Sequence, residues 1–145
     1  MRQLKWIGVV MVALAVVAAF RGAIGSDGQR AYDDMPTLTT VQEFEQKVES
    51  ADRPVLVDFY ATWCGPCHKL APVIGSLARE YGDRVDFYRV DTDKADELTR
   101  KMNIQYIPAV FIYVNGEPTR KLGLASRETF AKALEEALRQ TASSQ

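Results

Sequence analysis

The feature that most constrains the fold is the apolar run from Pro54 to Tyr60, which reads Pro-Val-Leu-Val-Asp-Phe-Tyr. Its hydrophobic residues are continuous rather than alternating, which is typical of a strand buried on both faces at the centre of an α/β sheet. Asp58 is the one charged residue in the run. A carboxylate there must be paired, hydrated or protonated, because burying a bare charge is costly. We therefore expect a central strand that carries a buried carboxyl group.

Further strands and helices alternate around this run. Hydrophobic periodicity predicts strands over 37–39, 85–91, 107–114 and 117–122, and helices over 40–50, 64–81, 93–102 and 126–139. Thr40, Asp93 and Ser126 are the expected helix caps. Asn115-Gly116 predicts a two-residue hairpin, so the last strand pairs antiparallel. The order β-α-β-α-β-α-β-β-α therefore predicts an α/β fold with a central mixed sheet flanked by helices.

The N-terminus resembles a targeting segment. Arg2 and Lys5 precede an uncharged run of 15 residues from Trp6 to Phe20. This length suits the hydrophobic part of a signal peptide and is short for a membrane span, which needs roughly 20 apolar residues. We expect residues 1–25 to be a signal peptide cut after Gly25, or a retained membrane anchor. Residues 26–36 then form a polar linker, 37–141 the folded domain and 142–145 a C-terminal tail, in an exported, periplasmic or other extracytoplasmic protein.

The charge balance argues against nucleic acid as a partner. The net charge is −1 over the 145 residues, and without residues 1–25 there remain 15 Lys and Arg against 19 Asp and Glu. Nucleic-acid binding needs a basic surface that displaces counterions, and the sequence holds no basic cluster of that kind.

The two cysteines of the chain, Cys64 and Cys67, lie three positions apart. Two cysteines cannot supply a Cys₄ or Cys₃His zinc site, and so short a loop gains little stability from a disulfide. Cys64 falls where a helix begins, and the helix dipole and free N–H groups there favour a thiolate. We expect Cys64 to attack a substrate disulfide, Cys67 to resolve the mixed disulfide, and Asp58 to accept the proton that Cys67 loses.

The chain resembles the thioredoxin family over about residues 37–139. The resemblance is carried by Val57-Asp58-Phe59-Tyr60-Ala61, Trp63-Cys64-Gly65-Pro66-Cys67, Pro72, Ile107-Pro108, Gly116 and Gly123. It implies the thioredoxin fold and a redox-active disulfide between Cys64 and Cys67. It further implies a cis peptide bond before Pro108, which faces the cysteines. Backbone groups of Ile107 would bind an extended substrate strand, and Trp63 would shield the cysteine pair and contribute to docking.

Two positions depart from the family pattern. The family often has a lysine near the buried aspartate, and Arg89 stands at the matching position. Arginine stays charged, so it can tune Asp58 differently. The position after the second cysteine is usually lysine or arginine in the family, and here it is His68, the only histidine of the chain. The sequence leaves the roles of Arg89 and His68 open.

The resemblance implies a protein-disulfide reductase, because Gly65-Pro66 between the cysteines is similar to the loop of reducing thioredoxins. The expected partners are disulfide-containing protein substrates and a membrane electron donor that recycles an exported, monomeric protein without a cofactor. A thiol oxidant or isomerase of the same fold is one alternative, and a non-catalytic binding module is another. Residues 64–68 also match the C-x-x-C-H pattern of c-type haem attachment, with Met102 as the candidate distal ligand.

Overall fold

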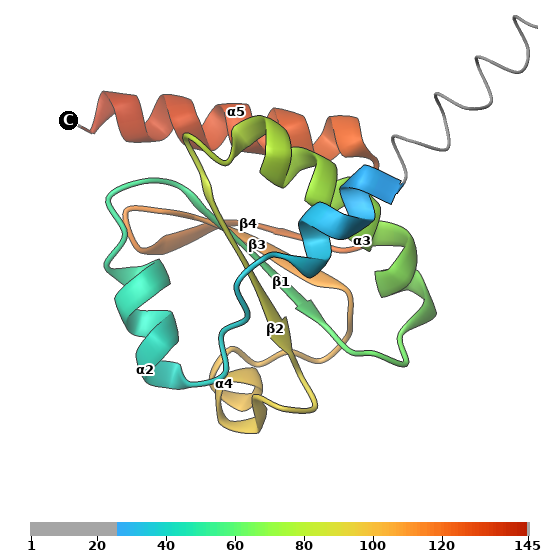
Figure 1. Cartoon of the computed structure of the whole chain (residues 1–145). Coiled ribbons are helices and arrows are strands. Elements are labelled where there is room, and N and C mark those ends of the chain that lie inside the picture. The colour runs from blue at the N-terminus through green and yellow to red at the C-terminus, as the bar shows by residue number, and fades with distance from the viewer. Residues whose placement is uncertain (1–25, 145) are drawn as a thin grey trace, which may run out of the picture.

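A four-stranded mixed sheet lies at the centre of the computed structural model, which describes residues 26–144 (Figure 1). The expected leader over residues 1–25 lies outside the described residues. The strands are β1 (Val55–Tyr60), β2 (Asp86–Asp91), β3 (Ala109–Val114) and β4 (Glu117–Leu122), in the spatial order β2-β1-β3-β4. β1 pairs parallel with β2 and antiparallel with β3, and β4 pairs antiparallel with β3. The predicted mixed sheet with a buried central strand is confirmed.

The helices cover both faces of this sheet. α3 (Gly65–Tyr81) and α5 (Arg127–Ser143) lie on one face, and α2 (Val41–Phe44) and α4 (Asp96–Lys101) lie on the other (Figure 1). α2 continues as a π-helical segment over Glu45–Glu49. α5 extends to Ser143, two residues into the predicted tail. None of the helices in the described part of the chain has the length and hydropathy that a membrane span requires.

Local signals account for several boundaries. The capping box forms as predicted, since the Thr40 side chain accepts from the Glu43 N–H and the Glu43 carboxylate accepts from the Thr40 N–H. Asn115 and Gly116 have φ values of 52° and 81° in the hairpin. A Cβ on Gly116 would lie 2.2 Å from the Glu49 carbonyl oxygen, so only glycine fits both the turn and its neighbour.

Three local predictions are wrong. Residues 26–33 form a helix, called here the N-terminal helix, instead of a polar linker, and Tyr32 at its end is buried. The strand expected over 37–39 is reduced to one bridge between Thr37 and Arg89. Asp93 does not cap α4, whose N-cap is Ala95 without a side-chain hydrogen bond. Composition favoured a linker and a cap, but long-range contacts determine the structure at these positions.

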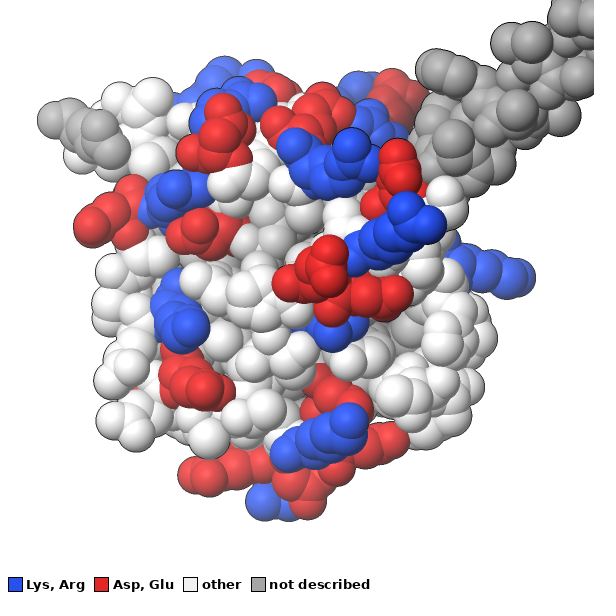
Figure 2. Space-filling model, viewed as in Figure 1, with Lys and Arg blue, Asp and Glu red and all other residues white. Residues whose placement is uncertain are grey.

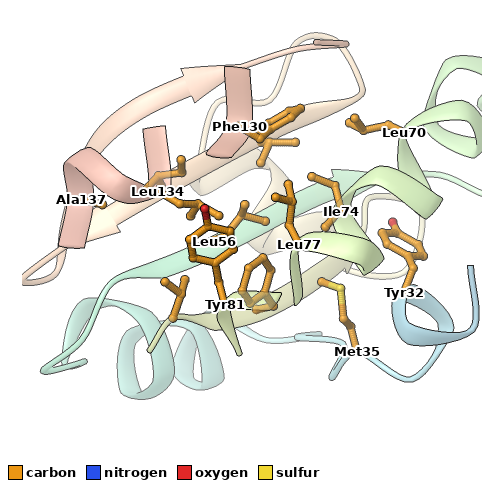
Figure 3. Close-up of a cluster of buried hydrophobic side chains, with 14 of the residues drawn as sticks. Tyr32, Met35, Leu56, Leu70, Ile74, Leu77, Tyr81, Phe130, Leu134 and Ala137 are labelled. Carbon is orange, nitrogen blue, oxygen red and sulfur yellow. The ribbon is translucent and has the colours of Figure 1, made fainter. Parts of the chain in front are cut away.

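The sheet separates two apolar clusters. The first joins Leu56 of β1 to α3, α5 and the N-terminal helix, and Figure 3 shows Tyr32, Ile74, Leu77 and Phe130 among its side chains. The second packs the other face of β1 against α2 and α4. Because both faces of β1 are covered, Asp58 within it is fully buried.

Candidate active site

Cys64 sits at the start of α3, where β1 and its following turn end. It is the N-cap of the helix, and its Sγ accepts a hydrogen bond of 3.3 Å from the Cys67 N–H. No acidic residue occupies the first turn of the helix. The free N–H groups and the positive end of the helix dipole therefore act on this sulfur without an opposing carboxylate. This geometry favours a thiolate on Cys64 in the reduced protein.

Cys64 and Cys67 form a disulfide, with their Cα atoms 5.3 Å apart. Both residues are buried, at 4% and 3% exposure. Both cysteines belong to a small buried cluster with Ala61 and Ile107, but only Cys64 lines an open groove. Of the two residues, Cys64 is therefore the one that can be reached from the groove.

Asp58 is the buried carboxyl group that the sequence predicts. It points to the same face of the sheet as Leu56, the face that α3 covers, because alternate residues of a strand share a face. Its Oδ2 accepts a hydrogen bond of 2.7 Å from the Tyr32 hydroxyl, and its Oδ1 has no partner among the described residues. Burial raises the pKa of Asp58 to about 6, while the Tyr32 hydrogen bond and the Arg89 charge act in the opposite direction.

Arg89 lies beside Asp58 in the register of β1 and β2. Its guanidinium donates to the Asp33 carbonyl at 2.8 Å and to the Thr37 hydroxyl at 3.0 Å. It also lies over the rings of Tyr32 and Tyr60, at 5.4 and 5.7 Å from their centroids. Arg89 therefore acts on Asp58 through its charge while its hydrogen bonds hold the N-terminal segment against β2.

Trp63 is 70% exposed beside the disulfide. Its indole Nε1–H donates a hydrogen bond of 2.8 Å to Asp93 Oδ2. Asp93, which was expected to cap α4, therefore binds the Trp63 indole instead. It orients a large, exposed aromatic side chain at the edge of the groove.

The groove beside Cys64 has a volume of about 420 Å³. It brings together five of the predicted site residues, namely Trp63, Cys64, Gly65, Pro66 and Ile107. The remaining lining residues were not predicted: Thr92, Thr99, Ile104, Gln105 and Tyr106. Their positions follow from how α4 and its flanking loops fold back on the motif, which no local spacing reveals. Closeness in sequence to Ile107 is the one signal that could have indicated Gln105 and Tyr106.

Pro108 is buried and follows a cis peptide bond from Ile107, as the family resemblance implied. Ile107 packs against the cluster that holds Cys64 and Cys67. Asp58 does not line the groove, and neither does Cys67. Pro108 is also absent from the lining, so of the three residues expected to bind substrate only Trp63 and Ile107 border the groove.

His68 contacts the backbone of the turn before the helix. Its Nε2 lies 2.8 Å from the Thr62 carbonyl oxygen, a distance at which the N–H tautomer donates. This bond fixes the turn that carries Trp63. Haem attachment would require the Cys64–Cys67 disulfide to be reduced and the His68 imidazole to leave the Thr62 carbonyl.

The comparisons with known proteins agree with this geometry. The thioredoxin family model matches residues 35–136. The chain belongs to the thioredoxin family. It is 38% identical over 86 residues to a thioredoxin of Borreliella burgdorferi, a match that spans 59% of this chain and 74% of the relative. It is 35% identical over 82 residues to thioredoxin Y, chloroplastic, of Oryza sativa, covering 57% of this chain and about half (49%) of that relative.

The fold comparison points the same way. Mitochondrial thioredoxin 3 of Saccharomyces cerevisiae, in its oxidised form, superimposes with a TM-score of 0.67 at 27% identity, covering 73% of this chain and 98% of that one. The expected thioredoxin fold is therefore confirmed. The chain is a thioredoxin-like thiol–disulfide oxidoreductase with Cys64 and Cys67 as its cysteine pair.

The raised pKa of Asp58 predicts how stability depends on pH. The folded protein holds this proton up to about pH 6, whereas the unfolded chain releases it near pH 4, so the stabilisation is present at low pH and is lost as the pH rises through about 6. Between pH 5 and pH 7 the oxidised wild type should lose about 1 kcal/mol of unfolding free energy relative to Asp58→Asn. Urea denaturation at the two pH values measures the difference. Parallel changes in both proteins would contradict a raised pKa at Asp58.

Proposed function

We propose that this protein is a protein-disulfide reductase that works outside the cytoplasm. The single observation that carries the reductase activity is the placement of Cys64, which caps α3 with its sulfur and lines the groove while Cys67 lies behind it. A thiolate at a helix start, open to one side only, is suited to attack a disulfide brought into that groove.

The reaction follows from this arrangement. The Cys64 thiolate attacks one sulfur of the substrate disulfide, forming a mixed disulfide and releasing the other substrate sulfur as a thiolate. Cys67 then gives its proton to Asp58 and attacks the Cys64 sulfur. The second substrate sulfur leaves as a thiolate, and the Cys64–Cys67 disulfide forms. Two electrons pass to the substrate, and a reductant must return them to the protein.

The substrate class follows from the shape of the groove. An open groove beside an exposed indole, with Ile107 in its lining, suits an extended peptide better than an enclosed small molecule. Ile107 would pair with the peptide backbone and Trp63 would cover one side of it. Basic and acidic side chains are interspersed on the face shown in Figure 2, which supports protein substrates rather than nucleic acid.

The location rests on the sequence of residues 1–25, whose basic start and uncharged run are typical of export. An exported thioredoxin cannot be recycled by a cytosolic reductase. The proposal therefore includes a membrane electron donor that reduces the Cys64–Cys67 disulfide from the extracytoplasmic side.

Insulin reduction tests catalysis by the cysteine pair. The wild type should accelerate insulin precipitation in the presence of dithiothreitol, and Cys64→Ser should reduce the rate to that of dithiothreitol alone, because the nucleophile is lost. Cys67→Ala is the matched variant, since it keeps the nucleophile and should accumulate mixed disulfides that a non-reducing gel resolves. Equal activity of Cys64→Ser and the wild type would mean that the groove binds without catalysing exchange.

The reduction potential tests the direction of electron flow. Equilibration with glutathione buffers should give a value near the roughly −270 mV of reducing thioredoxins. The Gly65-Pro66 loop and the apolar cover over the disulfide support this expectation. A potential near the −120 mV or so of strong oxidants would replace the reductase assignment with a thiol oxidant.

A further inference from the structure

The contact between Tyr32 and Asp58 joins the buried carboxyl group to a segment that precedes the family match. That match begins at residue 35. Tyr32 ends the N-terminal helix and is only 4% exposed. Its hydroxyl donates to Asp58 Oδ2 at 2.7 Å, and Asp58 Oδ1 keeps no partner among residues 26–144. One oxygen of the carboxyl group thus accepts a hydrogen bond, and the other has no hydrogen-bond partner among the described residues.

Backbone contact between two helices makes this placement possible. The N-terminal helix crosses α3 where Gly28 meets Gly75 and Pro72, a proline inside α3 (Figure 1). A Cβ on Gly75 would lie 1.8 Å from the Gly28 carbonyl oxygen, and a Cβ on Gly28 would lie 2.4 Å from the Pro72 carbonyl oxygen. Only glycine at these positions lets the helices approach closely enough for Tyr32 to reach Asp58.

Two polar contacts hold the same helix at its ends. Asp27 pairs with Arg79 of α3 at 3.2 Å. At the other end, Arg89 of β2 donates to the Asp33 carbonyl and covers the Tyr32 ring. These contacts hold both ends of the helix that places the Tyr32 hydroxyl against Asp58.

We propose that Tyr32 is a positioning residue for the proton step of the exchange reaction: it holds Asp58 by Oδ2 and leaves Oδ1 to accept the Cys67 proton. The proposal rests on the proposed function. In the step, the Cys67 S–H bond breaks, the proton goes to Oδ1, and the Cys67 sulfur forms a bond to Cys64 as the substrate sulfur leaves. Tyr32 keeps its own proton throughout, since burial and the nearby Asp58 carboxylate raise its pKa well above the usual range.

Two groups act directly on Asp58, Tyr32 from the N-terminal helix and Arg89 from β2, and Tyr60 of β1 acts on the Tyr32 hydroxyl in turn. Cys67 of α3 enters as the proton donor of the proposed reaction. Tyr32 donates its hydrogen bond to the charged form of Asp58 and so lowers its pKa, which keeps the group ionised and able to accept a proton near neutral pH. Loss of the hydroxyl should raise the pKa of Asp58 and leave a larger fraction of the group protonated at that pH.

Direct titration of Asp58 tests the contact without any turnover. In oxidised Tyr32→Phe, the carboxyl carbon of Asp58, followed by NMR, should titrate about one pH unit higher than in the wild type. Tyr113→Phe is the matched control, because it removes a buried hydroxyl that has no partner among the described residues. An unchanged Asp58 titration in folded Tyr32→Phe would overturn the proposal, whatever the outcome with Cys64→Ser.

A second variant tests the docking of the helix. Gly28→Ala should lift the N-terminal helix from the Pro72 carbonyl and raise the Asp58 pKa in the same direction, whereas Arg30→Ala on the exposed side of that helix should not. A pKa that is unchanged in Gly28→Ala would contradict the role assigned to the helix.

The kinetic test separates positioning from a general loss of structure. In reduced Tyr32→Phe, resolution of a mixed disulfide should slow about threefold at pH 6.5 and return to the wild-type rate above about pH 8.5, where Asp58 is ionised in both proteins. Tyr113→Phe should follow the wild-type pH profile. A rate that falls equally at every pH would show that Tyr32 has a structural role only.

Discussion

The structure depends on one costly burial, that of the Asp58 carboxyl group in the central strand of the sheet. Both faces of β1 are covered, so this group has no solvent to stabilise its charge. The protein compensates with a hydroxyl from the N-terminal helix and the charge of Arg89, and the pKa still stays raised. A partly compensated carboxyl group of this kind is suited to gaining and losing a proton during a reaction, whereas a fully satisfied one would not be.

The same burial sets the layout of the active site. The face of the sheet to which Asp58 points is covered by α3, and the start of that helix carries both sulfurs. Cys64 faces the groove with Trp63 and Ile107, while Cys67 faces inward. In the proposed mechanism, the residues that line the groove meet the substrate, and Cys67 and Asp58 handle the proton.

Local patterns predicted most of the fold and the outer layer of the site. The capping box at Thr40, the Asn115-Gly116 hairpin and the cap at Ser126 depend on neighbouring residues, so the sequence reveals them directly. The N-terminal helix was missed because a glycine such as Gly28 is typical of a loop. In the structure a glycine is needed there because the backbone packs against the distant Pro72 carbonyl. Asp93 was misassigned for the same kind of reason, because its partner is Trp63, thirty positions away.

The central claim is that Cys64 is the nucleophile and Cys67 the shielded, resolving thiol. Brief alkylation of the reduced protein with iodoacetamide at pH 7, followed by peptide mass mapping, tests it without a substrate or a partner. The account predicts that the label lies on Cys64 while Cys67 remains unmodified, because only Cys64 combines the helix start with access to the groove. Labelling of Cys67 first, or of both cysteines at equal rates, would contradict it.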